Sequence, residues 1–253
     1  MKSVTIMLVA FIGFIFTDSI AQTKVVLLDI SLEDKSEYLK VSPDIFIHYQ
    51  NIVENQLGAK LIVNEDREVN SELLKDADVL IVLSTLSSAP GKKSRTETER
   101  RSIVDFVKKG GRLILFTDEN RRMNLEAFGA NDITNPFGIE FGDDLPMVRN
   151  VGAISFPGEV VTGRYELPYS GSREITGGIP LSVMNAEGGI VHGVYVKLDN
   201  GGRLVAFGET MVGLFIGGVT ATMPDGSSFA WKGKDNYPFM KELITWMLET
   251  GPE

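Results

Sequence analysis

Acidic side chains follow two of the segments that the sequence predicts to be parallel strands. Thr117-Asp118-Glu119-Asn120 comes directly after the apolar segment 113–116, and Glu209-Thr210 follows the segment 203–207. Ligands of open parallel sheets bind outside the carboxyl ends of the strands, where these residues would lie. Clustered carboxylates can act as a general acid and base, bind hard metal ions or accept hydrogen bonds from sugar hydroxyls. We therefore expect a ligand-binding crevice formed by Asp118, Glu119, Asn120, Glu209 and Thr210.

Polar residues also end three earlier predicted strands. They are Asp29 with Ser31, Asn64-Glu65-Asp66, and Ser84-Thr85. Asp and Asn are common in loops and at helix caps, so the simpler interpretation of any single residue is a cap or a solvated side chain. Arg121-Arg122 has an interpretation of its own. Together with Asn120, these arginines could bind an anionic group at the start of a helix.

Several kinds of chemistry are excluded by what the chain lacks. It has no cysteine and two histidines, so it has no disulfide, no thiol nucleophile and no structural zinc site. The phosphate-binding pattern G-x-x-x-x-G-K-[ST] is absent, and no G-x-G-x-x-G follows a predicted strand. The nucleophile-elbow pattern G-x-S-x-G is absent around Ser84. We expect no metal and no cofactor.

The two histidines are predicted to be structural. His192 alternates with Ile190, Val194 and Val196, which places it on an apolar strand face. It could shuttle protons, but no nucleophile is nearby in the sequence, so we favour a buried, hydrogen-bonded histidine. His48 lies beside the apolar stripe of a predicted helix and is interpreted as a boundary residue.

The composition is that of a globular protein with an acidic balance. The chain has 253 residues, 43% hydrophobic and 23% charged, and 25 basic against 34 acidic residues give a net charge of −9. Nucleic-acid-binding proteins usually carry a basic surface, so we expect no nucleic-acid partner.

The first segment predicts targeting rather than folding. Lys2 precedes an uncharged apolar run at 4–16, and Ser19-Ile20-Ala21 places small residues at −3 and −1 of a cleavage before Gln22. These are the parts of a secretory signal peptide, which we assign to residues 1–21. An uncleaved anchor is the alternative, but the run is shorter than a membrane span of about 20 residues. We expect a secreted or periplasmic protein with no stable membrane span after cleavage.

Residues 22–253 are predicted to form one α/β domain in which strands and helices alternate. Short apolar runs predict buried strands at 24–30, 60–63, 79–83 and 113–116. Helical spacing predicts helices from Ser42-Pro43-Asp44 to Gly58, over 71–75, and from the capping box of Thr96 and Glu99 to Lys109. This alternation favours a parallel sheet with right-handed crossovers.

The second half of the chain is less regular. Residues 130–190 are rich in glycine and proline, with strand-like pieces at 139–141, 160–161 and 165–167, and form either an irregular insertion or a β extension of the same domain. The segments 190–197 and 203–207 flank Asp199-Asn200-Gly201-Gly202, which predicts a hairpin. A last helix opens at Asp235 with an apolar stripe.

Taken in order, several segments resemble the class I glutamine amidotransferase-like superfamily. The resemblance covers nearly all of 24–249 and is strongest to members without an active site, which occur beside ABC-transporter and gliding-motility proteins and in an intraflagellar-transport protein. The segments are 77–82, 106–115, 135–141, 175–179, 201–209 and 235–246. The resemblance implies a flavodoxin-like three-layer sandwich with a mainly parallel sheet, a Gly/Pro-rich β insertion and a late β-hairpin.

The same resemblance shows what is missing. Active members hold a cysteine in the turn that corresponds to Thr117-Asp118-Glu119, and a histidine and a glutamate after the strand that here ends in Phe207-Gly208-Glu209-Thr210. Covalent catalysis needs the activated nucleophile and its base. This chain lacks both at these positions, which excludes amidotransferase activity while leaving the fold intact.

Two hypotheses of different classes remain. The first is an exported, non-catalytic binding or scaffold domain that holds a small polar ligand, such as a carbohydrate, or a protein partner. The second is a hydrolase of a glycan or another small polar substrate, in which Asp118 or Glu119 is paired with Glu209. A carboxylate pair of that kind needs one raised and one ordinary pKa.

Overall fold

A computed structural model describes residues 23–88, 93–145, 152–169, 171–184, 189–217, 220–222, 228–230 and 235–249. The predicted signal peptide at 1–21 lies outside these residues. Within them, no helix combines the length and the apolar character that crossing a membrane requires.

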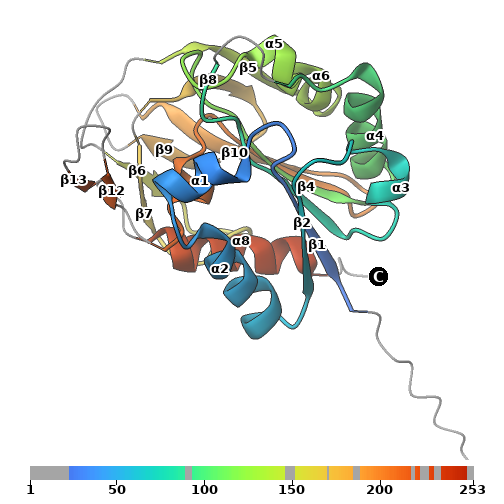
Figure 1. Ribbon diagram of the computed structural model, residues 1–253, viewed down its shortest axis with the longest axis horizontal. Helices are drawn as coiled ribbons and strands as arrows, with labels where there is room; N and C mark the ends of the chain where they lie inside the picture. The colour runs from blue at the N-terminus through green and yellow to red at the C-terminus, as the bar shows by residue number, and fades with distance from the viewer. Residues whose placement is uncertain are drawn as a thin grey trace, which may run out of the picture.

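A nine-stranded sheet in the order β2-β1-β3-β4-β11-β10-β9-β6-β7 forms the centre of the molecule (Figure 1). The parallel part consists of β2 (Lys60–Asn64), β1 (Val25–Asp29), β3 (Val79–Val82), β4 (Arg112–Phe116) and β11 (Arg203–Phe207). The antiparallel part consists of β10 (Val191–Lys197), β9 (Ile179–Met184), β6 (Ala153–Ser155) and β7 (Glu166–Leu167). The predicted α/β class, the parallel strands and the hairpin formed by β10 and β11 are confirmed.

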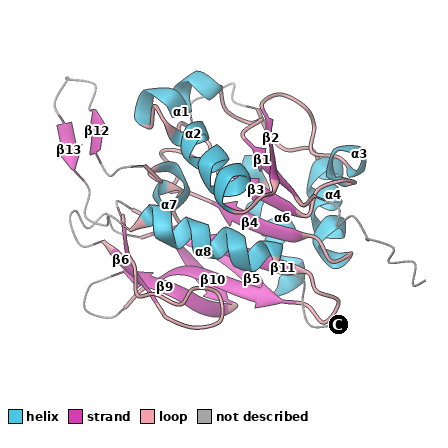
Figure 2. Cartoon of the chain, turned by 90° about the horizontal axis from the view of Figure 1, so that it is seen from below, coloured by secondary structure: helices cyan, strands magenta, loops and turns pink. Residues whose placement is uncertain are grey.

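Helices cover both faces of the sheet, so the parallel strands are apolar on both sides. Val26 and Leu28 point to one face, and Leu27 points to the other. The first face packs against α1 (Lys35–Val41), α2 (Ile45–Gln50), the π-helical turns η1 (Asn51–Gln56), α7 (Met211–Leu214) and α8 (Asn236–Leu248) (Figure 2). The second packs against α3 (Ser71–Leu74), α4 (Glu97–Lys108), α5 (Leu125–Phe128) and α6 (Ala130–Thr134). This is the three-layer sandwich that the sequence predicts.

One predicted helix start is wrong. Ser42 does not cap the helix that follows it, because a helix that we did not predict, α1, ends there and the Ser42 amide donates to the Tyr38 carbonyl. Asp44 is the N-cap residue of α2 instead. The end of that helical segment is as predicted, since Gly58 adopts the left-handed conformation (φ 65°) that L side chains avoid.

The Gly/Pro-rich region does two different things. β6, β7 and β9 extend the main sheet, whereas β5 (Ile139–Asp144) pairs with β8 (Arg173–Gly177) in a separate two-stranded sheet beyond the 3₁₀ turn η2 (Asn135–Phe137). A third small sheet joins β12 (Thr220–Thr222) to β13 (Ser228–Ala230). The strand-like piece at Val160–Val161 is buried but forms a turn and not a strand, because the Gly158 amide donates a hydrogen bond to the Val161 carbonyl.

The predicted capping box of α4 is present and gives a stability prediction. Thr96 Oγ1 accepts from the Glu99 amide at 3.2 Å, and the Glu99 carboxylate accepts from the Thr96 amide at 2.8 Å. We expect Thr96→Ala to lower the free energy of unfolding by about 1 kcal/mol, a loss of roughly 2–4 °C in Tm. Urea and thermal unfolding measure both. Thr98→Ala, on the exposed first turn of the same helix, is the control, and an equal loss there would contradict this account.

Candidate functional site

The parallel pairing of β4 with β11 brings the two predicted acidic segments together. Phe116 and Phe207 are in register at the carboxyl ends of these strands, and both the amide and the hydroxyl of Thr117 donate to the Phe207 carbonyl, at 2.9 and 2.8 Å. The chain leaves β4 at Asp118 and leaves β11 at Glu209. The sequence prediction that these two carboxylates lie at one corner of the fold is therefore realised in the structure.

Asp118 is fully buried at this corner. Its Oδ1 accepts from the Glu119 amide at 2.9 Å, its Oδ2 lies 3.3 Å from an Arg122 guanidinium nitrogen, and the backbone of Thr210 also bonds the carboxyl. Burial raises the pKa of Asp118 to about 7; Arg122 opposes this increase, and the nearby charge of Glu209 adds to it. Asp118 is thus a carboxyl group that can hold a proton near neutral pH.

Glu209 lies at the end of a buried line of polar groups. His192 Nε2 is 3.6 Å from the Glu209 carboxylate, and His192 Nδ1 is 3.0 Å from the Ser182 hydroxyl. Burial, followed by the charge of Glu209, raises the pKa of Tyr169 to about 12, and the Tyr169 ring packs 5.9 Å from the His192 ring. Ser182, His192 and Glu209 are all completely buried, so the serine is not placed to attack a bound substrate. His192 is the hydrogen-bonded core histidine that the sequence predicts.

The two arginines of the turn pair with the acids of the same turn. Arg121 forms an ion pair with Glu119, and Arg122 forms one with Asp118. The Glu119 side chain is 8% exposed and the Arg121 side chain 50% exposed, so this ion pair lies at the rim of the corner. An anion bound by Arg121 and Arg122, as the sequence predicts, would therefore have to compete with the ion pairs that these arginines form with Glu119 and Asp118.

Arg173, on β8, holds the turn in place and was not among the predicted residues. It donates from Nε to the Asp118 carbonyl at 2.6 Å and from one terminal nitrogen to the Asn120 side-chain oxygen at 2.7 Å. Its other terminal nitrogen lies 3.5 Å from Asp144 of β5. No pattern in the sequence marks this arginine, because its partners come from three separate segments.

A glycine allows the start of β8 to approach β11. The Arg173 amide donates to the Gly208 carbonyl at 3.0 Å. A Cβ atom at position 208 would lie 2.2 Å from the Ser172 hydroxyl and 2.5 Å from the Arg173 carbonyl oxygen, closer than real Cβ contacts. Gly208 is therefore needed for Arg173 to reach the turn after β4.

The remaining predicted residues divide between the rim and the interior. Asn120 is exposed, and its amide donates to the Asp144 carboxylate at 3.0 Å. Thr210 is fully buried, and its carbonyl accepts from Leu214 at the end of the first turn of α7. Its hydroxyl has no hydrogen-bond partner among the described residues. Within the same residues, no group of three or more acids and histidines could hold a metal ion.

The polar residues after β1 and β2 form a different cluster. Asp29 is fully buried and pairs with Arg95, and its other oxygen accepts from the Asn64 side chain at 2.7 Å. Ser84 is buried as well, and its carbonyl accepts from the Tyr38 hydroxyl at 2.7 Å. Asp29, Asn64 and Ser84 are therefore neither helix caps nor solvated, as the simpler interpretation had them, but buried groups that close the loops after β1, β2 and β3. Glu65 and Asp66 are exposed, which agrees with that interpretation.

The pKa of Asp118 predicts how stability depends on pH. The group binds its proton more tightly in the folded chain (pKa about 7) than at its ordinary value of 3.8. The unfolded chain loses the proton first, so the contribution is fully present below pH 3.8 and is lost as pH rises to about 7. The free energy of unfolding should fall by up to about 1.4 kcal/mol per pH unit over this interval.

Asp118→Asn should make this fall between pH 5 and pH 7 shallower, because the titrating group is gone. Urea unfolding at closely spaced pH values measures the slope. Asp132→Asn is the matched control, since its carboxylate is 60% exposed and should leave the slope unchanged. A wild-type slope in Asp118→Asn would show that the pKa assigned to Asp118 is wrong.

Comparisons with known proteins agree on the fold. No family model and no curated protein matches the sequence. The structure is similar to the "mmIFT52 N-terminal domain", with a TM-score of 0.60 and 11% identity, covering 90% of this chain and 99% of that one. It is also similar to a ThuA-like protein from Bacteroides uniformis, with a TM-score of 0.54 and 12% identity, covering 92% and 95% of the two chains. ThuA-like proteins belong to the class I glutamine amidotransferase-like superfamily, so this chain has an amidotransferase-like α/β fold.

Proposed function

We propose that this chain is an exported, non-catalytic binding or scaffold domain of amidotransferase-like fold. The observation that carries the proposal is the closed corner at the ends of β4 and β11. The family resemblance puts a reactive thiol in this turn, and the chain has Thr117-Asp118-Glu119 there instead. Asp118 and Glu209 are fully buried and interact with other groups of the protein.

Buried and internally bonded polar groups are poor catalysts because a substrate cannot reach them. Asp118 is occupied by Arg122 and two backbone amides, and its backbone carbonyl is held by Arg173. Freeing either carboxylate would leave a charged group without its partners in the interior, which is costly. Such an arrangement stabilises the loop connections, and it supports a domain that presents surfaces rather than one that turns over a substrate.

The ligand proposed for this edge is small and polar, such as a carbohydrate, or it is a polar segment of a partner protein. Asn120, Asp143 and Asp144 are exposed beside the closed corner, on the turn after β4 and on β5. Carboxylates and amides at a rim accept and donate hydrogen bonds to sugar hydroxyls and to peptide groups. The ordered corner below would hold them in place when the ligand binds.

Ligand binding can be tested by thermal shift with sugars, peptides and divalent ions, together with pull-down of partner proteins. A ligand at one hundred times its Kd adds about 2.7 kcal/mol to the free energy of unfolding, which raises Tm by several degrees. Asn120→Ala should reduce that increase. Asn55→Ala, an exposed asparagine on η1, should not. Absence of any stabilising probe and of any partner would refute the proposal, as would equal effects of the two variants.

One observation favours the hydrolase as a second candidate. Asp118 has a raised pKa of about 7 beside Glu209, and one raised carboxyl in a pair is what acid–base hydrolysis requires. The hydrolase would need the corner to open so that both carboxyls flank a substrate. Full burial of both groups is the reason that we rank this function second.

Glu209→Gln separates the two functions. If the chain is a hydrolase, this variant should lose any turnover of glycan substrates by a factor of 100 or more, on the scale of lost general acid–base catalysis. If it is a binding domain, the wild-type protein shows no turnover above buffer. Initial rates with chromogenic glycosides measure this, and far-UV circular dichroism checks that the variant is folded. A wild-type turnover that Glu209→Gln leaves unchanged would dismiss the carboxylate mechanism.

A further inference from the structure

The amino-terminal edge of the sheet, opposite the candidate site, is lined with basic residues. Lys24 precedes β1, Arg112 begins β4 and Arg203 begins β11. The chain as a whole carries a net charge of −9, so a group of cations at one edge is not expected from composition alone. Parallel strands place their starts side by side, which gathers these three residues.

Arg112 is a largely buried cation whose guanidinium has no hydrogen-bond partner among the described residues. Its residue surface is 8% exposed, and its guanidinium makes no hydrogen bond or ion pair with any residue in the part of the chain that the structure describes. Its Nε is completely buried and has no acceptor. A buried guanidinium needs acceptors to offset the loss of hydration, and here the described protein does not supply them.

The neighbouring charges add to this deficit. Arg203 lies directly opposite Arg112 in the register of β4 and β11, so two like charges face each other across the strands. Arg203 already has a partner, because it donates a hydrogen bond to the Trp246 carbonyl and its guanidinium carbon lies 4.4 Å from the centre of the Trp246 ring. Burial, together with the charge of Arg203, lowers the pKa of Arg112.

Asp78 supplies too little negative charge to balance this group. It attracts Arg112, but its oxygens are already used by the Lys24 ammonium at 3.0 Å and by the Val25 amide at 2.8 Å. Lys24 and Arg112 are therefore both attracted to one carboxylate, that of Asp78. Nε is the only guanidinium nitrogen of Arg112 that is completely buried, so an additional anion at this edge would bind the terminal nitrogens and reduce the repulsion between the two arginines.

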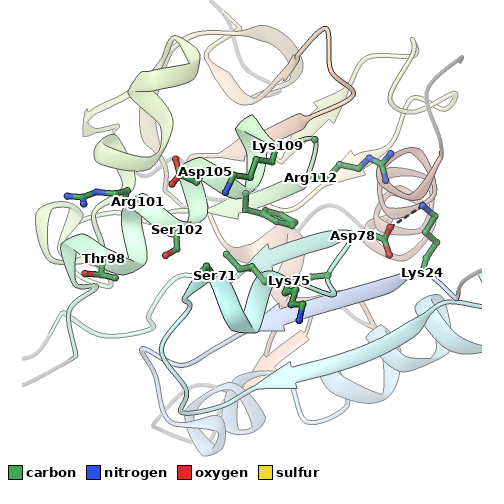
Figure 3. Close-up of a pocket in the computed structure, with 15 residues that line it drawn as sticks. Lys24, Ser71, Lys75, Asp78, Thr98, Arg101, Ser102, Asp105, Lys109 and Arg112 are labelled. Atoms are coloured by element: carbon green, nitrogen blue, oxygen red, sulfur yellow. Dashed lines mark hydrogen bonds and ion pairs between the residues drawn. The ribbon is translucent and has the colours of Figure 1, made fainter.

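A hollow is present where that anion would bind. A pocket of about 740 Å³ lies between α3 and α4 at the starts of β1, β3 and β4, and a neighbouring hollow of about 680 Å³ lies beside the hairpin turn. Gly110 and Arg112 line both. Figure 3 shows Arg112 and Lys24 at one end of the first pocket on either side of Asp78, with Lys109 on α4 along its wall.

We propose that this pocket binds a ligand through an oxyanion group, a carboxylate or a phosphate. Arg112 is the principal donor, because its planar guanidinium can bind such a group with two parallel hydrogen bonds. Lys24, which pairs with Asp78, adds positive charge beside Arg112, and Lys109 adds positive charge farther along the pocket wall. The site lies at the opposite edge of the sheet from Asp118 and Glu209, so it is independent of the function proposed above.

Isothermal titration calorimetry with inorganic phosphate and with citrate, at low ionic strength, tests the proposal in the protein without residues 1–21 and in the full chain. We expect one of the two probes to bind, and Arg112→Gln to weaken its binding at least tenfold. Lys109→Gln, at a more exposed position, should weaken binding several-fold. Arg67→Gln removes the same charge from an exposed loop after β2 and should change the affinity less than twofold.

The outcomes separate clearly. Preferential binding of phosphate or of citrate identifies the class of the oxyanion. Absence of binding for both probes, an unchanged affinity in Arg112→Gln, or an equal loss in Arg67→Gln would overturn the proposal. If Arg112→Gln does not fold, Lys109→Gln and Lys24→Gln decide in the same assay, and unchanged affinity in both would overturn it.

Discussion

The candidate site depends on the burial of one guanidinium, that of Arg173. Its side chain is 2% exposed, so its nitrogen atoms must find acceptors within the protein. It donates to the Asp118 carbonyl and the Asn120 side chain, and further to the carbonyls of Met123 and Gly142. These contacts join β8, the turn after β4, and β5. A residue from the Gly/Pro-rich region therefore helps to set the conformation of the turn, in addition to the contacts that the turn makes within itself.

This arrangement explains how the corner can be acidic and still be buried. Asp118 and Glu209 repel each other, and each has a cation or a protonatable partner nearby: Arg122 for Asp118 and His192 for Glu209. Repulsion between the carboxylates is relieved when Asp118 holds a proton, which its raised pKa allows. The corner thus holds acidic groups whose partners are other groups of the same protein.

The sequence predicted the parts of the fold that depend on local patterns. The strands of the parallel sheet lie within one residue of their predicted ends, since continuous apolar runs such as that of β3 require burial on both faces. The expectation that Asp118 and Glu209 lie near each other followed from their positions at the carboxyl ends of two predicted parallel strands. Arg173 could not be predicted in the same way, because its partners are far apart in the chain. The sequence also left open how the Gly/Pro-rich region extends the sheet, because β6 and β7 have only three and two residues and give no clear periodicity.

The two edges of the sheet differ in how their charged groups are paired, and this contrast is informative about binding. At the carboxyl edge, acids such as Glu119 meet arginines of the same turn, and the groups are balanced internally. At the amino-terminal edge, Arg112 and Arg203 face each other, and the carboxylate that attracts Arg112, that of Asp78, is already paired with Lys24. Charged groups that are already paired have little to gain from a ligand, whereas an unpaired guanidinium gains the hydrogen bonds it lacks. In this chain the unpaired group, Arg112, lies at the edge of the sheet away from the buried acidic corner.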